Sequence, residues 1–319
     1  MRQLNFDAIL VVMLIHASGQ IYPDFFLLTF GGSCQYAIKK EDGCLLFDPG
    51  LSIHIPYLYK RMEMELHKQP DQIKEIFITH LHPERVAAIP YLKQRSEIVL
   101  YGSSLMQEKL NDESFVRDIY DQDQEICALY DLDSTVQPLS FEDFYAALKI
   151  DTVFPDSEVF QINENIRVRC VKAEGHTEES FAFVVEPYDF VVVDEGFGYF
   201  RGKELAAPGG DWSLEKSLTT IRYFNDVEIS AICFPNIGMI TGHLVRTHLQ
   251  SILDSYEDLI KESKKQDLPV EEKVATLKKT FYSSFSRDPL VHYALERTFQ
   301  AVLKQLGLVA EESCEGSEE

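Results

Sequence analysis

The sequence is poor in positive charge. It has 30 Lys and Arg residues against 52 Asp and Glu residues, which gives a formal net charge of -22 at pH 7. A surface of this kind repels phosphate backbones and anionic lipid headgroups, so we expect neither nucleic acid nor a membrane as a partner. An anionic substrate would have to be attracted by a local cation, either a metal ion or a suitably placed arginine.

The chain also lacks paired cysteines and long apolar segments. Its six cysteines are scattered without a C-x-x-C pair, which favours free, mostly buried thiols in a reducing cytoplasm. No stretch approaches the roughly 20 apolar residues that a membrane helix requires. The apolar run at residues 8–15 is short and follows Asp7, so we interpret Ile9 to Ile15 as a buried strand and not as a secretory signal. These features predict a cytoplasmic protein.

Strand-like and helical segments alternate along the chain. With 45% hydrophobic residues in 319, the chain can bury a large core. One set of apolar runs lies before residue 102 and a second between residues 158 and 234, while an acidic, helical stretch runs from Leu105 to about Lys149. Beyond Gly242 the pattern is helical. Two sheets covered by helices fit this order, and so does an ordinary three-layer α/β fold.

The most informative segment is I-F-I-T-H-L-H-P-E-R, from Ile76 to Arg85. An apolar strand ends at Thr79, and His80 and His82 follow with a spacing of two. In an extended strand end, residues i and i+2 point to the same side, so both imidazoles can reach one metal ion. The alternative is a pair of surface histidines, and a third histidine in a comparable motif argues against it.

That third histidine is His176, in E-G-H-T-E-E-S-F between two predicted strands. Gly175 allows a close backbone approach, and Thr177 or Ser180 can form local hydrogen bonds. Such a loop presents one imidazole inward, although a turn histidine without a ligand role is an alternative. His243 starts a predicted helix and would touch the site only if its loop were built differently.

Five motifs in this order resemble those of the metallo-β-lactamase superfamily, over roughly residues 25–245. C-L-L-F-D-P-G contains Asp48, which by this resemblance supports the metal loop; T-H-L-H-P-E-R resembles T-H-x-H-x-D-H; and E-G-H-T-E-E-S resembles P-G-H-T-x-G-S. V-V-V-D-E-G resembles the strand that carries a metal-bridging aspartate, here Asp194. C-F-P-N-I-G-M-I-T-G resembles the strand end that carries the last histidine.

The resemblance implies an α/β fold, an αββα four-layer sandwich with a helical insert and a helical C-terminal extension. We place the metallo-β-lactamase-like domain at residues 1–250, with the acidic helical insert at 105–150. The C-terminal helical extension then spans 251–310, and the acidic tail 311–319 is expected to be disordered. The implied first metal site consists of His80, His82 and His176.

The chain departs from the family at the implied second metal site. The family has Asp then His where this chain has Glu84 then Arg85, and Ile237 stands at the last histidine position. The second site therefore keeps only Glu84 and Asp194. Arginine stays protonated and offers no lone pair to a metal, but its guanidinium can take the place of a cation. We hypothesise that Arg85 replaces the charge of the second metal and holds Asp194 in position.

A metal on three histidines with an open fourth position implies a hydrolase. It would use one metal-activated water on a small ester, thioester, lactone or phosphoester. Zinc is the expected ion, iron and manganese are alternatives, and Asp194 is an expected further ligand. Asp194 or Glu84 could orient the water as a general base, and Arg85 could bind an anionic group of the substrate.

Two other functions stay open at this point. One is a non-catalytic binding or regulatory protein that keeps the same fold, which the changes at Arg85 and Ile237 favour. The other is an iron-dependent redox or oxygen-binding protein, because histidine and carboxylate ligands also suit iron. We expect a small molecule as the partner and allow for a homodimer.

Overall fold

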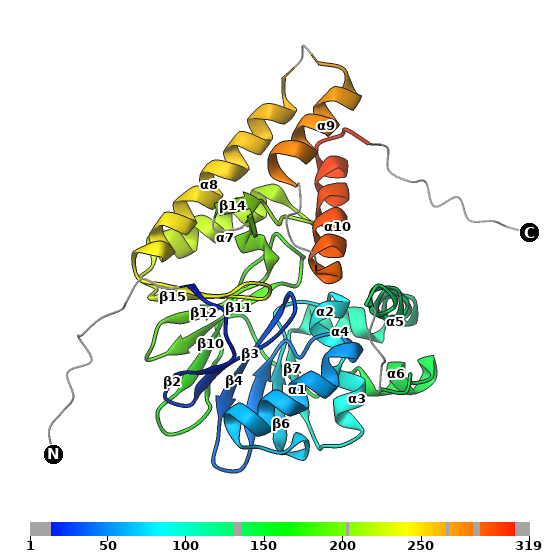
Figure 1. Ribbon diagram of the computed structural model, residues 1–319, viewed down its shortest axis with the longest axis vertical. Helices are drawn as coiled ribbons and strands as arrows, with labels where there is room; N and C mark the ends of the chain where they lie inside the picture. The colour runs from blue at the N-terminus through cyan, green and yellow to red at the C-terminus, as the bar shows by residue number, and fades with distance from the viewer. Residues whose placement is uncertain (1–13, 131–135, 202–203, 266–267, 283–287, 310–319) are drawn as a thin grey trace, which may run out of the picture.

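The computed structural model describes residues 14–130, 136–201, 204–265, 268–282 and 288–309 (Figure 1). Two seven-stranded sheets pack face to face and helices cover both outer faces, so the predicted αββα sandwich is confirmed. The first sheet has the order β2-β3-β4-β5-β6-β7-β8. Its strands are β2 Gly19–Tyr22, β3 Phe25–Phe30, β4 Ser33–Lys39, β5 Cys44–Phe47, β6 Ile73–Phe77, β7 Val99–Gly102 and β8 Thr152–Val153.

The second sheet has the order β1-β16-β15-β12-β11-β10-β9. Its strands are β1 Leu14–Ile15, β9 Val159–Gln161, β10 Arg167–Lys172, β11 Phe181–Glu186, β12 Phe190–Val192, β15 Ala231–Phe234 and β16 Gly238–Thr241, with a separate hairpin β13 Tyr199–Arg201 and β14 Glu204–Ala207. Most of the predicted strand at Ile9 to Ile15 lies outside the described residues, and its last two residues form β1. The predicted tail 311–319 also lies outside them.

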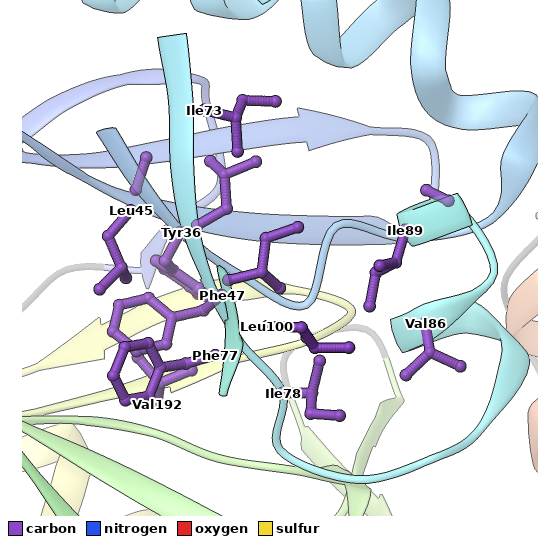
Figure 2. Close-up of a cluster of buried hydrophobic side chains, with 14 of the residues drawn as sticks. Tyr36, Leu45, Phe47, Ile73, Phe77, Ile78, Val86, Ile89, Leu100 and Val192 are labelled. Carbon is purple, nitrogen blue, oxygen red and sulfur yellow. The ribbon is translucent and has the colours of Figure 1, made fainter. Parts of the chain in front are cut away.

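Aromatic side chains from both sheets meet in the core between them. Phe47 of β5 and Phe77 of β6 each contact Phe183 of β11, with ring centroids 5.5 and 5.4 Å apart. Figure 2 shows Phe47 and Phe77 beside Val192 of β12. Every residue of β5 is buried, as expected for a central strand covered on both faces, which pairs in parallel with β6 and antiparallel with β4.

Helices cover the two outer faces. Over the first sheet lie η1 Ser52–His54, α1 Ile55–Arg61, η2 Met62–Leu66, η3 Pro70–Gln72, α2 Pro83–Val86, α3 Ile89–Lys93 and the insert helices α4 Ser104–Asn111, α5 Glu113–Ala128 and α6 Phe141–Ala147. On the other side are η4 Glu195–Phe197, α7 Leu214–Asp226, α8 His243–Ser263, α9 Val270–Phe281 and α10 Pro289–Gln305. Among the described residues, no helix is long and apolar enough to cross a membrane.

Parallel pairing gathers the carboxyl ends of several strands at one edge of the sandwich. β5, β6 and β7 run parallel in the first sheet, and β12 and β15 run parallel in the second. Ligand sites of α/β folds lie outside such carboxyl ends. The loop after β6 is tied to the second sheet because the backbone N–H of Phe181 donates to the carbonyl of Thr79 at 2.8 Å. The predicted site residues follow these strand ends.

Helix α10 reaches across to this edge from the C-terminal part of the chain. Figure 1 shows α10, in red, running from the α8–α9 group down toward α2 and α5. Asp288 caps its first turn and also accepts hydrogen bonds from Gly32 N at 2.7 Å and from the Tyr130 hydroxyl at 2.9 Å. The C-terminal helices are therefore joined to the first sheet and to the insert, close to the site.

Candidate metal centre

The three histidines of the two motifs lie together, as predicted. His82 Nδ1 lies 3.0 Å from His80 Nε2 and 3.1 Å from His176 Nε2. The rings are nearly perpendicular, at 86–89°, with centroids 4.6–4.7 Å apart. Nitrogens about 2 Å from a tetrahedral zinc ion lie about 3.3 Å from one another. The cluster therefore has the size and the donor set of a metal site.

Hydrogen bonds fix the tautomer of His80. Thr79 donates its backbone N–H and its hydroxyl to the two carboxylate oxygens of Asp48, at 2.8 and 2.7 Å. Because its proton is engaged by Asp48, the Thr79 hydroxyl accepts the hydrogen of His80 Nδ1 at 3.0 Å. This leaves the lone pair on Nε2, which faces the other histidines. Burial raises the pKa of Asp48 to about 7, although Arg85 and the bonds from Thr79 oppose the rise.

We expect Asp48→Ala to weaken zinc binding about 10- to 100-fold, because residues that support a ligand histidine from behind have effects of this size. Competition with a chromophoric chelator measures the affinity. Asp123→Ala is the matched control: Asp123 is also buried, but it lies in the insert helix α5 and binds Ser52 of η1, so this variant should lose stability and keep its zinc affinity. Wild-type affinity in Asp48→Ala would contradict the assignment.

His176 is held on the opposite side of the cluster. Its Nδ1 donates to the carbonyl of Gly209 at 2.6 Å and lies 3.3 Å from Asp211, so Nε2 faces His82. Gly175 has φ +139°, and a Cβ there would lie 2.3 Å from Ser217 N, so only glycine fits before this histidine. Burial disfavours the charged ring, but Asp211 and Glu195 outweigh it and raise the pKa of His176 to about 10. The carboxylates around the cluster therefore attract positive charge.

The carboxylate against the rings is Glu195, whereas the sequence predicted Asp194. Glu195 Oε2 lies 3.4 Å from His176 Nε2 and 3.6 Å from His80 Nε2 and forms no hydrogen bond in the described structure. Asp194 instead caps the short turn η4, where its Oδ1 accepts the N–H of Gly196 at 2.9 Å. Burial raises the pKa of Asp194 to about 6. Asp194 Oδ2 is also buried without a hydrogen-bond partner, so Asp194 as ligand and base stays a prediction and Glu195 is a second candidate that the resemblance did not indicate.

The predicted pairing of Arg85 with Asp194 is wrong. Arg85 is buried and forms its ion pair with Glu195, not with Asp194. Glu84, which is also buried, pairs with Arg297 of α10, and this pairing holds the pKa of Glu84 well below its usual range despite burial. Each glutamate therefore has its own guanidinium. Arg297 was missed because it lies 213 positions from Glu84.

A further ion pair, also missed, supports the loop between the two histidines of the first motif. Glu179, in the motif of His176, accepts the N–H of Leu81 at 3.3 Å and pairs with Lys109 of α4 at 2.6 Å. The insert thus contributes to the placement of His80 and His82. The E-E doublet of E-G-H-T-E-E-S was the available signal.

The residues that the family would place at the second metal site are elsewhere. Ile237 lies in the turn between β15 and β16 and packs, partly buried, against the hydrophobic core. His243 is exposed at the first residue of α8. His248 Nε2 bonds with the carbonyl of Phe197 at 2.8 Å. In the part of the chain that the structure describes, the only histidine cluster of metal-site size is the trio.

The charge around the trio favours a divalent cation. The buried and partly buried carboxyl groups near it outnumber the guanidiniums by five to two, and in the described structure two of them, Asp48 and Asp194, form no ion pair with an arginine. The carboxyl groups are Asp48, Glu84, Asp194, Glu195 and Asp211, and the guanidiniums are Arg85 and Arg297. Buried charges without partners are costly. A metal ion on the three histidines would offset this excess, so the residues fit a bound divalent metal.

Comparison with known proteins agrees with this fold. Residues 28–156 match the family model described as the metallo-beta-lactamase superfamily. A family protein from Thermus thermophilus is 15% identical, with a TM-score of 0.61 and coverage of 90% of this chain and 95% of that one. A B3 metallo-β-lactamase with an active-site glutamic acid is 15% identical, with a TM-score of 0.55 over 78% and 92% of the chains. The chemotaxis sensor ODP, in a peroxy diiron state, is 12% identical, with a TM-score of 0.50 over 74% and 93%.

Proposed function

We propose that this chain, which has the metallo-β-lactamase fold, is a metal-dependent hydrolase with one metal ion on His80, His82 and His176. Its substrate would be a small ester, thioester, lactone or phosphoester. The observation that carries the proposal is the convergence of three imidazole nitrogens, two of them turned to the site by hydrogen bonds on their far side. Folds of this kind host many activities, so the site and not the fold supports the reaction type.

The residues around the trio are suited to hydrolysis. A divalent ion bound there supplies an acidic water and polarises a carbonyl or phosphoryl oxygen. Glu195 Oε2 faces the histidines without a hydrogen bond, so it would be placed to hold a proton taken from an attacking water and to pass it to a leaving group. Arg85 fixes the other oxygen of Glu195 and thereby orients the free one. His82, with a side chain 21% exposed, lies on the side from which a substrate can approach.

Metal content is the first test of this proposal. We expect about one zinc or iron ion per chain in protein purified without added metal, and loss of that ion in His80→Ala/His82→Ala. Elemental analysis must cover zinc, iron and manganese, because imidazole and carboxylate ligands suit all three. A panel of nitrophenyl esters, thioesters, lactones and phosphodiesters then tests activity. No metal after incubation with excess zinc would refute the proposal.

One contact favours a second candidate, a non-catalytic binding protein of the same fold. Arg297 Nη2 lies 2.9 Å from Nδ1 of His82, the nitrogen that would bind the metal. A guanidinium donating to this nitrogen competes with a metal for the same lone pair. The metal analysis separates the two candidates, because a binding protein of this kind would take up no metal unless Arg297 were replaced.

A further inference from the structure

Arg297 is the residue of helix α10 whose side chain contacts the site. Its guanidinium binds Glu84 with both terminal nitrogens, at 2.5 and 3.2 Å, and Nη2 also lies 2.9 Å from His82 Nδ1. Nε lies 3.7 Å from Asp211, which contacts His176. The Arg297 side chain is 20% exposed and that of Glu84 is fully buried. A single side chain therefore contacts one metal-site histidine, the carboxylate beside it and the carboxylate behind another histidine.

Helix α10 is firmly held where it carries this arginine. On one side of Arg297, Asp288 binds Gly32 and Tyr130. On the other, Gln305 donates to the carbonyls of Gly210 and Asp211 at 2.7 and 2.9 Å. The segment bound by Gln305 also supplies the Gly209 carbonyl that orients His176. The same helix thus contacts His82 through Arg297 and, through Gln305, holds the segment that orients His176.

We infer that Arg297 is a positioning residue that takes the place of a second cation beside Glu84 and limits the site to one metal. A buried glutamate next to a histidine nitrogen is a set of ligands that would attract a further divalent ion. Arg297 satisfies Glu84 with a bidentate, charge-assisted pair and leaves no room for such an ion. Arg85 is engaged by Glu195 and cannot serve Glu84 in the same way. The inference rests on the proposed one-metal site.

Metal stoichiometry and cobalt spectroscopy test this role without an activity assay. Wild type, Arg297→Met and Arg297→Lys are dialysed against graded zinc and analysed for metal per chain, and Co²⁺-substituted samples are compared by visible absorption. Lys278→Met is the matched control, because Lys278 pairs with Glu296 on the exposed side of α10 at 2.8 Å. Circular dichroism verifies that each variant is folded.

We expect one zinc per chain in wild type and Lys278→Met, and a second in Arg297→Met, where Glu84 is released. Arg297→Lys keeps the charge but loses the two-pronged hydrogen bonding to Glu84, so its cobalt spectrum should shift because Glu84, beside the ligand His82, is no longer held in place. If Arg297→Met does not fold, the spectrum of Arg297→Lys decides alone, and a spectrum identical to wild type overturns the inference. One zinc in Arg297→Met with wild-type affinity also overturns it while the proposed function stands. Two zinc ions in wild type overturn it together with the one-metal form of the proposed site. No metal in wild type refutes both.

Discussion

Replacing Arg85 by methionine is expected to lower the free energy of unfolding by about 3–5 kcal/mol, the cost of breaking a buried ion pair by removing one partner. Arg85 is 1% exposed, and so is Glu195, so the remaining carboxylate would have no water and would keep only His176, 3.4 Å away, as a counter-charge. Asp48 and Glu84, which Arg85 also stabilises electrostatically, would add to the loss. Urea denaturation of the metal-free protein, with EDTA present, measures the change, because a bound cation would mask part of it.

Two further variants test whether the unpaired charge causes the expected loss of stability in Arg85→Met. Arg85→Met/Glu195→Met removes both members of the pair and should be more stable than Arg85→Met alone, because a buried ion pair can be replaced by apolar residues at little cost. Lys278→Met breaks an ion pair whose side chains are about half exposed and should change the unfolding free energy by less than about 0.5 kcal/mol. An Arg85→Met protein with the wild-type urea midpoint would mean that this pair is not important for stability.

The strands were predictable because their apolar runs end at residues that disfavour strands. The segment Cys44–Phe47 lies between Gly43 and Asp48-Pro49, and β5 has those bounds. The prediction was less complete where the backbone departs from a regular helix or where strands far apart in the sequence pair. The helical periodicity from Ile55 to His67 was found, but the last part is a π-helix that ends at His67 in the left-handed region. Pairing between distant strands, such as Leu14 with Ile240, has no signal in either segment.

The same distinction between local pattern and distant contact holds for the site residues. His80, His82 and Glu84 share one short motif, and His176 has a motif of its own, so sequence alone could bring them together. Arg297 comes from a helix whose periodicity only indicates a buried face. Its role could be anticipated solely from the general need of a buried glutamate for a cation.

The choice between Asp194 and Glu195 depended on a turn that the sequence does not specify. Both follow β12 directly, and resemblance favoured the first. In the structure Asp194 Oδ1 caps η4 at Gly196, and Glu195 Oε2 lies 3.6 Å from His80 Nε2. Asp194 Oδ2 and Glu195 Oε2 are both buried without a hydrogen bond, so matched variants at the two positions test which carboxylate acts as the base.

Glu195→Gln is expected to lower kcat/KM for the best substrate of the panel about 100- to 10,000-fold, the usual contribution of a general base. The amide keeps the shape of the carboxylate and can still accept a hydrogen bond from Arg85, but it cannot take up a proton. The metal content should stay near one ion per chain, because the three histidines are intact. Elemental analysis and steady-state kinetics on the same preparation separate a lost proton acceptor from a lost metal.

Asp194→Asn is the matched comparison, because it makes the same chemical change one residue earlier. It keeps an oxygen that can accept the N–H of Gly196, so the turn should hold and kcat/KM should fall less than about tenfold. A larger loss in Asp194→Asn than in Glu195→Gln would return the role of base to Asp194 and mean that η4 rearranges when the metal binds. Equal, large losses would instead indicate that the two carboxylates act as one unit, with Asp194 fixing the turn from which Glu195 faces the water.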